Sequence, residues 1–363
     1  MKYFDAAATT RVKDEVVTEM LPLFSTIYGN PSSLHSMGLV GHLYLEKSRK
    51  TITEKLGIKD SELIFTSGAT ESNNIAIKSA ARWGGFTHRK HIITSTYEHP
   101  SVLNVIKELE KDGFDVTYVK PDKTGHISCQ DILDNITSET CLVSIMHTNN
   151  EIGTTNDIAT IGAICHRHGV LFHSDMTQYI GHTDKYMDFS YVDMFSFSGH
   201  KFGAPKGIGG LKISKNLLPL MSGGQQEFGL RPGTENVPYI VGMAKALELA
   251  RPIDKSKVEL LKNELATISD VTFNGNSDTS IINISIKGFK GEAVLAHLDS
   301  LDIYVSTGSA CHSESSEPSH VLKSIGLSDE QANSSVRISL PEDVTDEDVD
   351  YLVRAIRVLC SMR

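Results

Sequence analysis

The chain has 363 residues, of which 40% are hydrophobic, and its formal net charge is −10. A chain of this length buries a substantial core and suits one large and one small lobe. The acidic balance argues against direct nucleic-acid binding, which normally needs a basic surface. We therefore expect partners that are small metabolites or proteins.

The N-terminus and the cysteines indicate a reducing compartment. Asp5 stands where a signal peptide would need an apolar stretch, and no run is long and apolar enough to span a bilayer. The five cysteines contain no C-x-x-C pair, which disfavours both a disulfide framework and a structural zinc site. We expect a cytoplasmic protein with no membrane span and no resident metal.

Apolar patterns in the first half of the chain alternate between helix and strand. A helical pattern covers about 33–56, and a strand at 63–66 stops at a glycine turn that opens another helix. The pattern continues with strand 91–94, helix 102–109, strand 116–119, strand 141–146, helix 158–168, strand 170–173 and strand 192–197. This alternation predicts an α/β fold with a mostly parallel sheet and helices on both faces. Ligands of such sheets bind beyond the carboxyl ends of the strands.

The remainder of the chain predicts a second, smaller unit. After helix 241–250, which runs into Arg251 and Pro252, it contains in order a helix, strand 281–286, a helix, strand 336–340 and a terminal helix. We predict a large domain at 15–252 and a small α+β domain made of 1–14 and 253–363. The polar stretch that ends at Pro318 indicates a flexible loop over about 306–320.

The tetrapeptide Ser198–Lys201 is the most informative local signal. It places Lys201 after a hydroxyl and an imidazole, in a glycine turn behind an apolar strand. Such a lysine can hold a cofactor aldehyde as a Schiff base while its neighbours bind a phosphate. The turn Gly68–Thr70 opens a helix, where backbone N–H groups favour a phosphate; a simple N-cap is the alternative.

Two more polar residues fall at predicted strand ends. Asp175 can hold a pyridine nitrogen protonated, although strand-end aspartates are often turn residues. His99 precedes a proline and a helix start, where an imidazole can stack on a flat ring and move protons. A loop histidine that is merely solvated is the alternative.

The likeness to a known family rests on many segments. They are Phe4–Thr10, Tyr28–Ser33, Gly68–Asn74, Glu98–His99, Asn149–Gly153, Asp175–Gln178, Ser198–Lys201, Arg231–Asn236 and Gly308–Cys311. Together they resemble the pyridoxal-phosphate-dependent cysteine desulfurases of the NifS/IscS type, within the class V aminotransferases. The resemblance implies the fold-type I transferase architecture, pyridoxal 5'-phosphate as cofactor and a homodimer.

Carried over position by position, the resemblance implies three catalytic residues, Cys311, Lys201 and His99. Asp175 would pair with the pyridine nitrogen and Gln178 with the ring hydroxyl. The residues implied to hold the cofactor are Ala69, Thr70, His99, Asn149, Asp175, Gln178, Ser198, His200, Lys201 and Thr234, the last in the neighbouring subunit's site. Those implied to bind the substrate L-cysteine are Arg337, Asn149 and Asn30.

The implied reaction leaves L-alanine and a persulfide on Cys311, whose sulfur passes to an acceptor protein such as an iron–sulfur scaffold or a thiolation enzyme. Small and polar neighbours suggest that Cys311 is exposed. Cys129 and Cys141 adjoin strand-like runs, and Cys165 and Cys360 lie in helical ones; we interpret these four as structural.

Where this sequence departs from the family pattern, we expect the choice of sulfur-acceptor protein to be affected more than the desulfuration reaction. His312 follows the nucleophile where better-known members have threonine; it could lower the thiol pKa or ligate a metal, and Cys311 itself could transiently ligate an iron–sulfur cluster. The segment Gln225–Gly229 also differs. The alternatives are a selenocysteine lyase or another fold-type I enzyme in which Cys311 is incidental, and, from another class, a non-catalytic dimeric binding subunit.

Overall fold

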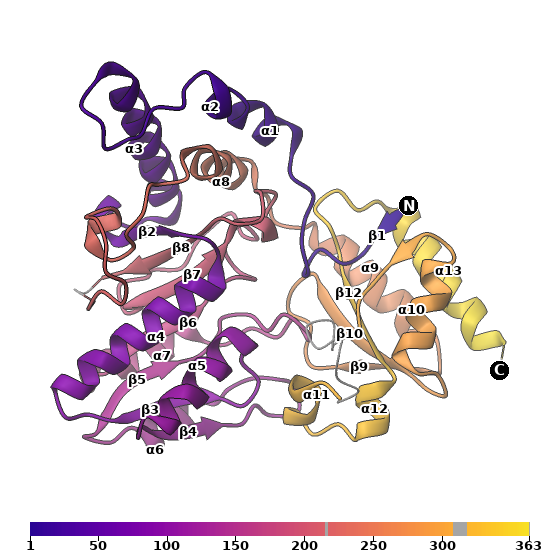
Figure 1. The fold of residues 1–363 in the computed structure, drawn as a ribbon. Helices are drawn as coiled ribbons and strands as arrows, with labels where there is room; N and C mark the ends of the chain where they lie inside the picture. Colours follow the sequence, from indigo (N-terminus) through magenta and orange to yellow (C-terminus); the bar gives the residue numbers. More distant parts are fainter. Residues whose placement is uncertain (215–216, 308–317, 363) are drawn as a thin grey trace.

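The computed structural model describes residues 1–214, 217–307 and 318–362 (Figure 1). Cys311 and His312 therefore lie outside the described residues. Within the described part, the strands form one sheet of seven, one of three and one of two strands. The seven-stranded sheet and the three-stranded sheet stand side by side in Figure 1, each with its own helices.

The seven-stranded sheet is mostly parallel, as the sequence predicts. In spatial order its strands are β2 (Leu63–Thr66), β8 (Gly209–Ile213), β7 (Met194–Ser198), β6 (Leu171–Asp175), β5 (Thr140–Ser144), β3 (His91–Ser95) and β4 (Asp115–Val119). The strands from β7 to β4 pair in parallel, whereas β8 runs antiparallel to both of its neighbours. Strand β8 has no counterpart among the predicted elements, because its first two glycines are typical of a turn.

Helices cover both faces of this sheet because its strands are apolar on both sides. Successive strand residues enter different hydrophobic clusters: Ile92 and Leu142 pack on one face, Ile93 and Val143 on the other. The first face is covered by α4 (Ala69–Phe86) and α5 (Pro100–Lys111). The second is covered by α1 (Asp14–Met20), α3 (Ser36–Leu56), α6 (Cys129–Asn135), α7 (Ile158–Arg167) and α8 (Val237–Leu249), and the short α2 (Pro22–Ser25) packs beside α8. The predicted fold class is confirmed.

The three-stranded sheet is antiparallel and has its own core. Its order is β12 (Ser335–Ser339), β10 (Ile281–Ile286), β9 (Val271–Asn274). The helices packed on it are α9 (Lys255–Ala266), α10 (Gly291–Asp299) and α13 (Asp346–Ser361). Phe4 of the N-terminal arm lies in the same core, and β1 (Lys2–Tyr3) pairs with β11 (Ile303–Tyr304). The exact domain boundaries stay a prediction.

Several predicted element ends shift in the structure. The strand predicted over 141–146 ends at Ser144, and the helix predicted from Val102 begins at Pro100. Cys129, which we placed beside a strand, instead begins α6, because the Ser128 hydroxyl caps that helix by accepting a bond from Asp131 N. Two further short helices are α11 (His320–Ser324) and α12 (Asp329–Asn333). Along the described chain, the search for a helix long and apolar enough to cross a membrane finds none.

Candidate active site

A pocket of about 550 Å³ lies at the carboxyl ends of β3, β5, β6 and β7. Ala7 and Ala8 of the N-terminal arm and Arg337 of β12 also line it, so residues from both larger units of the fold contribute to one site. This is the edge at which the predicted sheet should bind a ligand. The strand order thus brings together residues that are more than a hundred positions apart.

One end of the pocket is built to receive an anion. Gly68 joins β2 to α4 with φ of 154° and ψ of 179°, a conformation that is essentially restricted to glycine. A Cβ at this position would lie 3.4 Å from Ser198 Oγ, so this turn and the end of β7 approach closely. Ala69 and Thr70 line the pocket at the start of the helix, where the first N–H groups lack intrahelical partners.

His200 lies at the same end of the pocket and is neutral at pH 7. Burial, with smaller effects of the Lys201 and Lys206 charges, lowers the pKa of His200 to about 4. Its Nδ1 lies 3.1 Å from Thr9 Oγ1. The ring therefore acts as a neutral hydrogen-bonding group, while Lys206, which also lines the pocket, supplies positive charge.

Asp175, the last residue of β6, presents a buried carboxylate to the pocket. It is 6% exposed. Its Oδ2 accepts a hydrogen bond from Asn73 Nδ2 at 2.8 Å, and its Oδ1 accepts one from Thr177 N at 3.0 Å. These two bonds fix the orientation of the carboxylate. The carboxylate can then pair with a protonated ring nitrogen.

Lys201 reaches toward the N-terminal arm. Its Nζ donates to the carbonyl oxygens of Ala7 at 2.6 Å and of Ala8 at 2.8 Å. Gln178 Nε2 donates to the same Ala7 oxygen at 2.9 Å. The arm thus holds the lysine amine and the glutamine amide on one side of the pocket, close to the end of β6.

His99 is the N-cap residue of α5, at the position predicted for the helix start. Its Nδ1 accepts a bond from Ser101 N at 3.1 Å and lies 2.8 Å from Ser101 Oγ. The preceding residue, Glu98, is fully buried: its Oε1 accepts bonds from Ser95 Oγ and Met146 N. Burial raises the pKa of Glu98 to about 8. These contacts hold the turn that presents the imidazole to the pocket.

Arg337, expected at the substrate carboxylate, lines the pocket and is 4% exposed. Its Nη2 forms an ion pair with Asp5 at 2.7 Å, and its Nη1 donates to Asn150 O at 3.1 Å. Its Nε has no hydrogen-bond partner among the described residues. A buried guanidinium with an unsatisfied donor is suited to bind a carboxylate.

Three other expected ligands do not line the pocket as far as the chain is described. Asn149 is fully buried, and its Oδ1 instead accepts bonds from the backbone N–H groups of Glu151 and Ile152. Asn30 and Thr234 are exposed on the surface. In this single chain, the pocket is therefore built without these three side chains.

Comparison with known proteins assigns the family. The class-V aminotransferase family matches residues 2–352. The chain belongs to this family. Cysteine desulfurase IscS of Clostridium botulinum is 42% identical, over 99% of this chain and 94% of its own length. A solved NifS-like protein superposes with a TM-score of 0.91 at 36% identity and covers 100% of both chains. A solved structure of SspA in complex with cysteine has a TM-score of 0.85 at 38% identity, covering 94% of this chain and 99% of its own.

This class-V aminotransferase is thus a member of the NifS/IscS group, in which we expect Cys311 to be the nucleophile. The described residues on both sides of 308–317 lie at the pocket. Ser306 exchanges backbone hydrogen bonds with Arg337, at 2.7 and 3.1 Å. Ser319 Oγ donates to Glu151 Oε2 at 2.6 Å, and His320 Nε2 contacts Glu98 O at 2.9 Å. The described residues that precede 308 and follow 317 therefore both contact residues of the pocket.

The four described cysteines are all unlike an activated nucleophile. Cys141 and Cys165 are buried in the core, and burial raises the pKa of both thiols. Burial also raises the pKa values of Cys129 and Cys360, which are half-buried. None of the four lines the pocket, so within the described chain no thiol competes for the role expected of Cys311.

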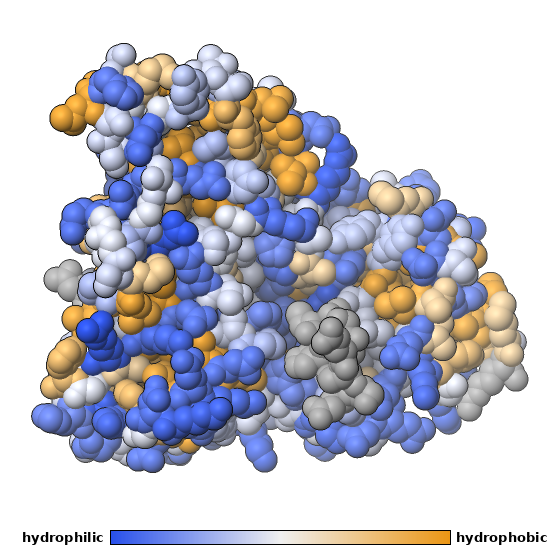
Figure 2. Space-filling model, in the orientation of Figure 1, coloured by the Kyte–Doolittle hydropathy of each residue, from blue (hydrophilic) through white to orange (hydrophobic). Residues whose placement is uncertain are grey.

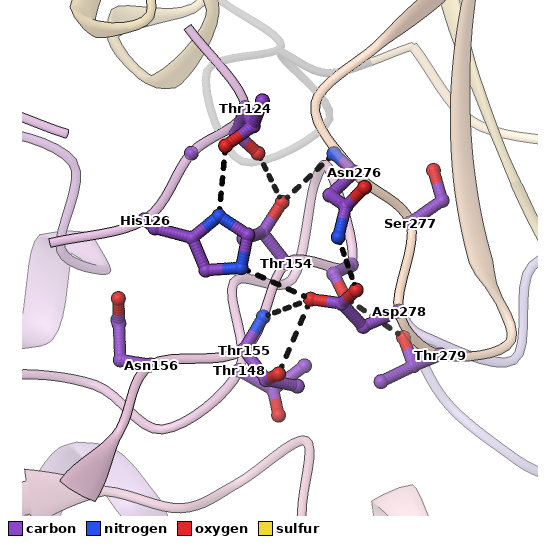
Figure 3. Close-up of polar contacts among 12 residues, drawn as sticks. Thr124, His126, Thr148, Thr154, Thr155, Asn156, Asn276, Ser277, Asp278 and Thr279 are labelled. Atoms are coloured by element: carbon purple, nitrogen blue, oxygen red, sulfur yellow. Dashed lines mark hydrogen bonds and ion pairs between the residues drawn. The ribbon is translucent and has the colours of Figure 1, made fainter. Parts of the chain in front are cut away.

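A polar junction beside the pocket joins the loop after β5 to the loop after β9 (Figure 3). Asp278 Oδ2 accepts bonds from Thr155 N at 3.0 Å and Thr155 Oγ1 at 3.2 Å, and lies 3.5 Å from His126 Nε2. Thr154 Oγ1 accepts from Asn276 N at 3.1 Å. Because the same loop carries Asn150 and Glu151, which line the pocket, this junction positions one wall of the pocket against the smaller sheet.

Sequence patterns do not identify several residues that complete the site. They are Asn73, Glu98, Ser101, Glu151 and Lys206. Asn73, Glu98 and Glu151 occur in segments that carry the family likeness, which is the one available signal. No local pattern shows that Asn73 contacts Asp175, since the two are 102 positions apart.

Proposed function

We propose that this chain is a pyridoxal 5'-phosphate-dependent cysteine desulfurase. It converts L-cysteine into L-alanine and transfers the sulfur to Cys311 as a persulfide. The observation that carries the proposal is the meeting of Lys201, Asp175 and the Gly68–Thr70 turn in one pocket. Support also comes from 42% identity over 99% of the chain to a protein named cysteine desulfurase.

The polar groups of the pocket fit those of the cofactor. The Gly68–Thr70 turn, Ser198 and His200 offer donors for its phosphate, with Lys206 nearby. Asp175 matches a protonated pyridine nitrogen. Lys201 Nζ would hold the aldehyde carbon, and Gln178 would contact the ring hydroxyl. When bound, this cofactor withdraws electrons from the substrate's α-carbon.

Side chains of the protein carry out substrate binding, proton transfer and sulfur transfer. Arg337 binds the substrate carboxylate through its guanidinium. Lys201 and His99 carry protons to and from the substrate carbons. At Cys311, a new S–S bond forms as the substrate's C–S bond breaks, and the carbon that loses sulfur takes up a proton. The products are L-alanine and the persulfide.

A homodimer accounts for the large apolar surface of the N-terminal helices. The exposed apolar side chains between α1 and α3 are Val17, Leu21, Phe24, Tyr28, Leu34, Met37, Leu39, Val40 and Leu43. Figure 2 displays hydrophobic residues gathered over these helices. Contiguous apolar surface of this kind favours a protein partner. Asn30 lies in the same region, and both it and Thr234 would serve the neighbouring subunit's site.

The persulfide sulfur would pass to an acceptor protein in the cytoplasm, such as an iron–sulfur scaffold or a thiolation enzyme. Acceptors are selected by surface contacts and not by the chemistry of the pocket. The acceptor therefore has to be captured on the persulfide form of the full chain.

Two substitutions test the activity. Lys201→Ala should remove the visible absorption band of the purified protein and the formation of alanine from cysteine. Cys311→Ser should abolish sulfide release in the presence of a thiol reductant, while Cys360→Ser, a half-buried thiol outside the pocket, should leave it intact. Sulfide release unchanged in Cys311→Ser would refute the persulfide step and favour a lyase or another fold-type I enzyme. A protein with no absorption band would favour a binding subunit.

A further inference from the structure

A chain of side-chain hydrogen bonds joins the two pocket residues Asp175 and His99 through two residues with no assigned role. Asn73 Nδ2 lies 2.8 Å from Asp175 Oδ2 and 2.8 Å from Ser101 Oγ. Ser101 Oγ in turn lies 2.8 Å from His99 Nδ1. Asn73 is fully buried and Ser101 is 9% exposed, so water competes little for these bonds.

The chemistry of the groups fixes the direction of every bond in this chain. The backbone N–H of Ser101 can only donate, and it donates to His99 Nδ1. His99 Nδ1 therefore carries a lone pair, and the Ser101 hydroxyl must donate to it as well. The hydroxyl oxygen is then open to accept from Asn73, whose other amide hydrogen points to the Asp175 carboxylate.

The orientation of the Asn73 amide supports a donor role. Its Oδ1 is buried and has no hydrogen-bond partner among the described residues. An unsatisfied buried carbonyl costs free energy. The opposite orientation would place that oxygen against the Asp175 carboxylate, which is less favourable still. The amide is thus held where both of its hydrogens are used, one on each acceptor.

We propose that Asn73 and Ser101 are positioning residues that fix the orientation of Asp175 and the tautomer of His99 as one unit. In this unit the neutral imidazole carries its proton on Nε2, because Nδ1 is occupied as an acceptor. Asp175 is held in one orientation, because Asn73 Nδ2 and Thr177 N each donate to one of its oxygens. The inference rests on the proposed function, in which Asp175 pairs with the cofactor and His99 moves protons.

The first test uses cofactor-free protein, so that it does not depend on activity. Nitrogen-15 spectra of histidine-labelled protein, assigned with His99→Gln, should display an acceptor-type Nδ1 in the wild type. Ser101→Ala should lower the ratio of the Nε2–H to the Nδ1–H tautomer about fivefold, the effect of one ordinary hydrogen bond. Ser79→Ala is the matched control: Ser79 is likewise a buried helical serine, on α4, but its hydroxyl donates to Leu218 O, away from the pocket.

The second test measures the dissociation constant of pyridoxal 5'-phosphate by absorbance titration. Asn73→Ala should raise this constant about tenfold, since charge-assisted bonds are the stronger ones. The double variant Asn73→Ala with Ser101→Ala should have the same dissociation constant as Asn73→Ala alone, because the effects of substitutions in one hydrogen-bond network are not additive. Additive effects, or a His99 spectrum in Ser101→Ala equal to that of Ser79→Ala, would overturn the proposal. A wild type that binds the cofactor but forms no alanine would instead contradict the proposed function and leave these two results standing.

Discussion

The buried ion pair between Arg49 of α3 and Glu227 allows a stability prediction with a magnitude. The Arg49 side chain is 4% exposed and that of Glu227 is 2% exposed, with Nη2 and Oε1 2.7 Å apart. Glu227 Oε2 also accepts a bond from Phe65 N at 2.7 Å. Arg49 Cζ lies 4.6 Å from the ring of Phe65 and 5.3 Å from that of Phe228.

Glu227→Gln keeps the shape of the side chain and strands the arginine charge. With the charge centres about 4 Å apart and an effective dielectric constant of about 20, the lost attraction is on the order of 4 kcal/mol. Breaking one side of a buried pair typically costs about 3–5 kcal/mol. Because Glu46 Oε1 also lies 3.3 Å from Arg49 Nε, we expect a loss of about 3 kcal/mol in the free energy of unfolding.

Guanidinium unfolding of the cofactor-loaded protein measures this loss. Glu46→Gln is the matched control, since it removes the same charge from the same arginine; its side chain is 44% exposed, and we expect less than about 1 kcal/mol. Adding Arg49→Met to Glu227→Gln removes the stranded charge and should recover part of the stability. Equal losses of unfolding free energy in Glu227→Gln and Glu46→Gln would refute the reasoning. So would a double variant that is less stable than Glu227→Gln alone.

Three further predictions concern the pocket and the surface. Glu98 has a pKa of about 8 against an ordinary value of 4.5, so between these values unfolding releases a proton and the wild type loses stability as pH rises, by up to about 1.4 kcal/mol per pH unit. Glu98→Gln should remove this contribution and make the slope of unfolding stability from pH 5 to 8 less negative. An unchanged slope would assign it to other groups, such as Glu151, whose pKa burial raises to about 7. Gly68→Ala should cost about 1–3 kcal/mol through its backbone conformation and weaken cofactor binding, whereas Gly85→Ala, where a Cβ meets no atom within 4 Å, should do neither; equal effects would count against strain. Leu21→Glu should shift sedimentation toward the monomer, and Val358→Glu on α13, also exposed, should not; a Leu21→Glu dimer would place the interface elsewhere.

Local patterns predict the parts of the site that depend on strand ends. Lys201, Asp175 and the Gly68–Thr70 turn each follow an apolar strand, and parallel strands present their carboxyl ends at one edge of the sheet. The sequence therefore predicts that these residues meet, and the structure lines one pocket with them. The proline after His99 also indicates the start of α5, because proline fixes the backbone at the first helical position, whereas the apolar pattern alone places that start at Val102.

Contacts between distant segments are not accessible in this way. The ion pair of Arg337 with Asp5, the burial of Asn149 and the bridge from Asn73 to Ser101 all depend on side-chain directions set by packing. A one-chain pattern also cannot reveal that β8 is antiparallel, because strand direction depends on the path of the connecting chain.

By itself, the sequence determined the α/β class, because hydrophobic periodicity and turn residues are local properties of the chain. Its motifs also carried the resemblance that indicates the family and implies the candidate site residues. Only the tertiary structure decided which groups share a hydrogen bond, and so that Asp175 and His99 are linked through Asn73 and Ser101. The physical reason is range: periodicity acts over one helix or strand, whereas a hydrogen bond requires two atoms about 3 Å apart, a condition that the packing of whole elements has to meet.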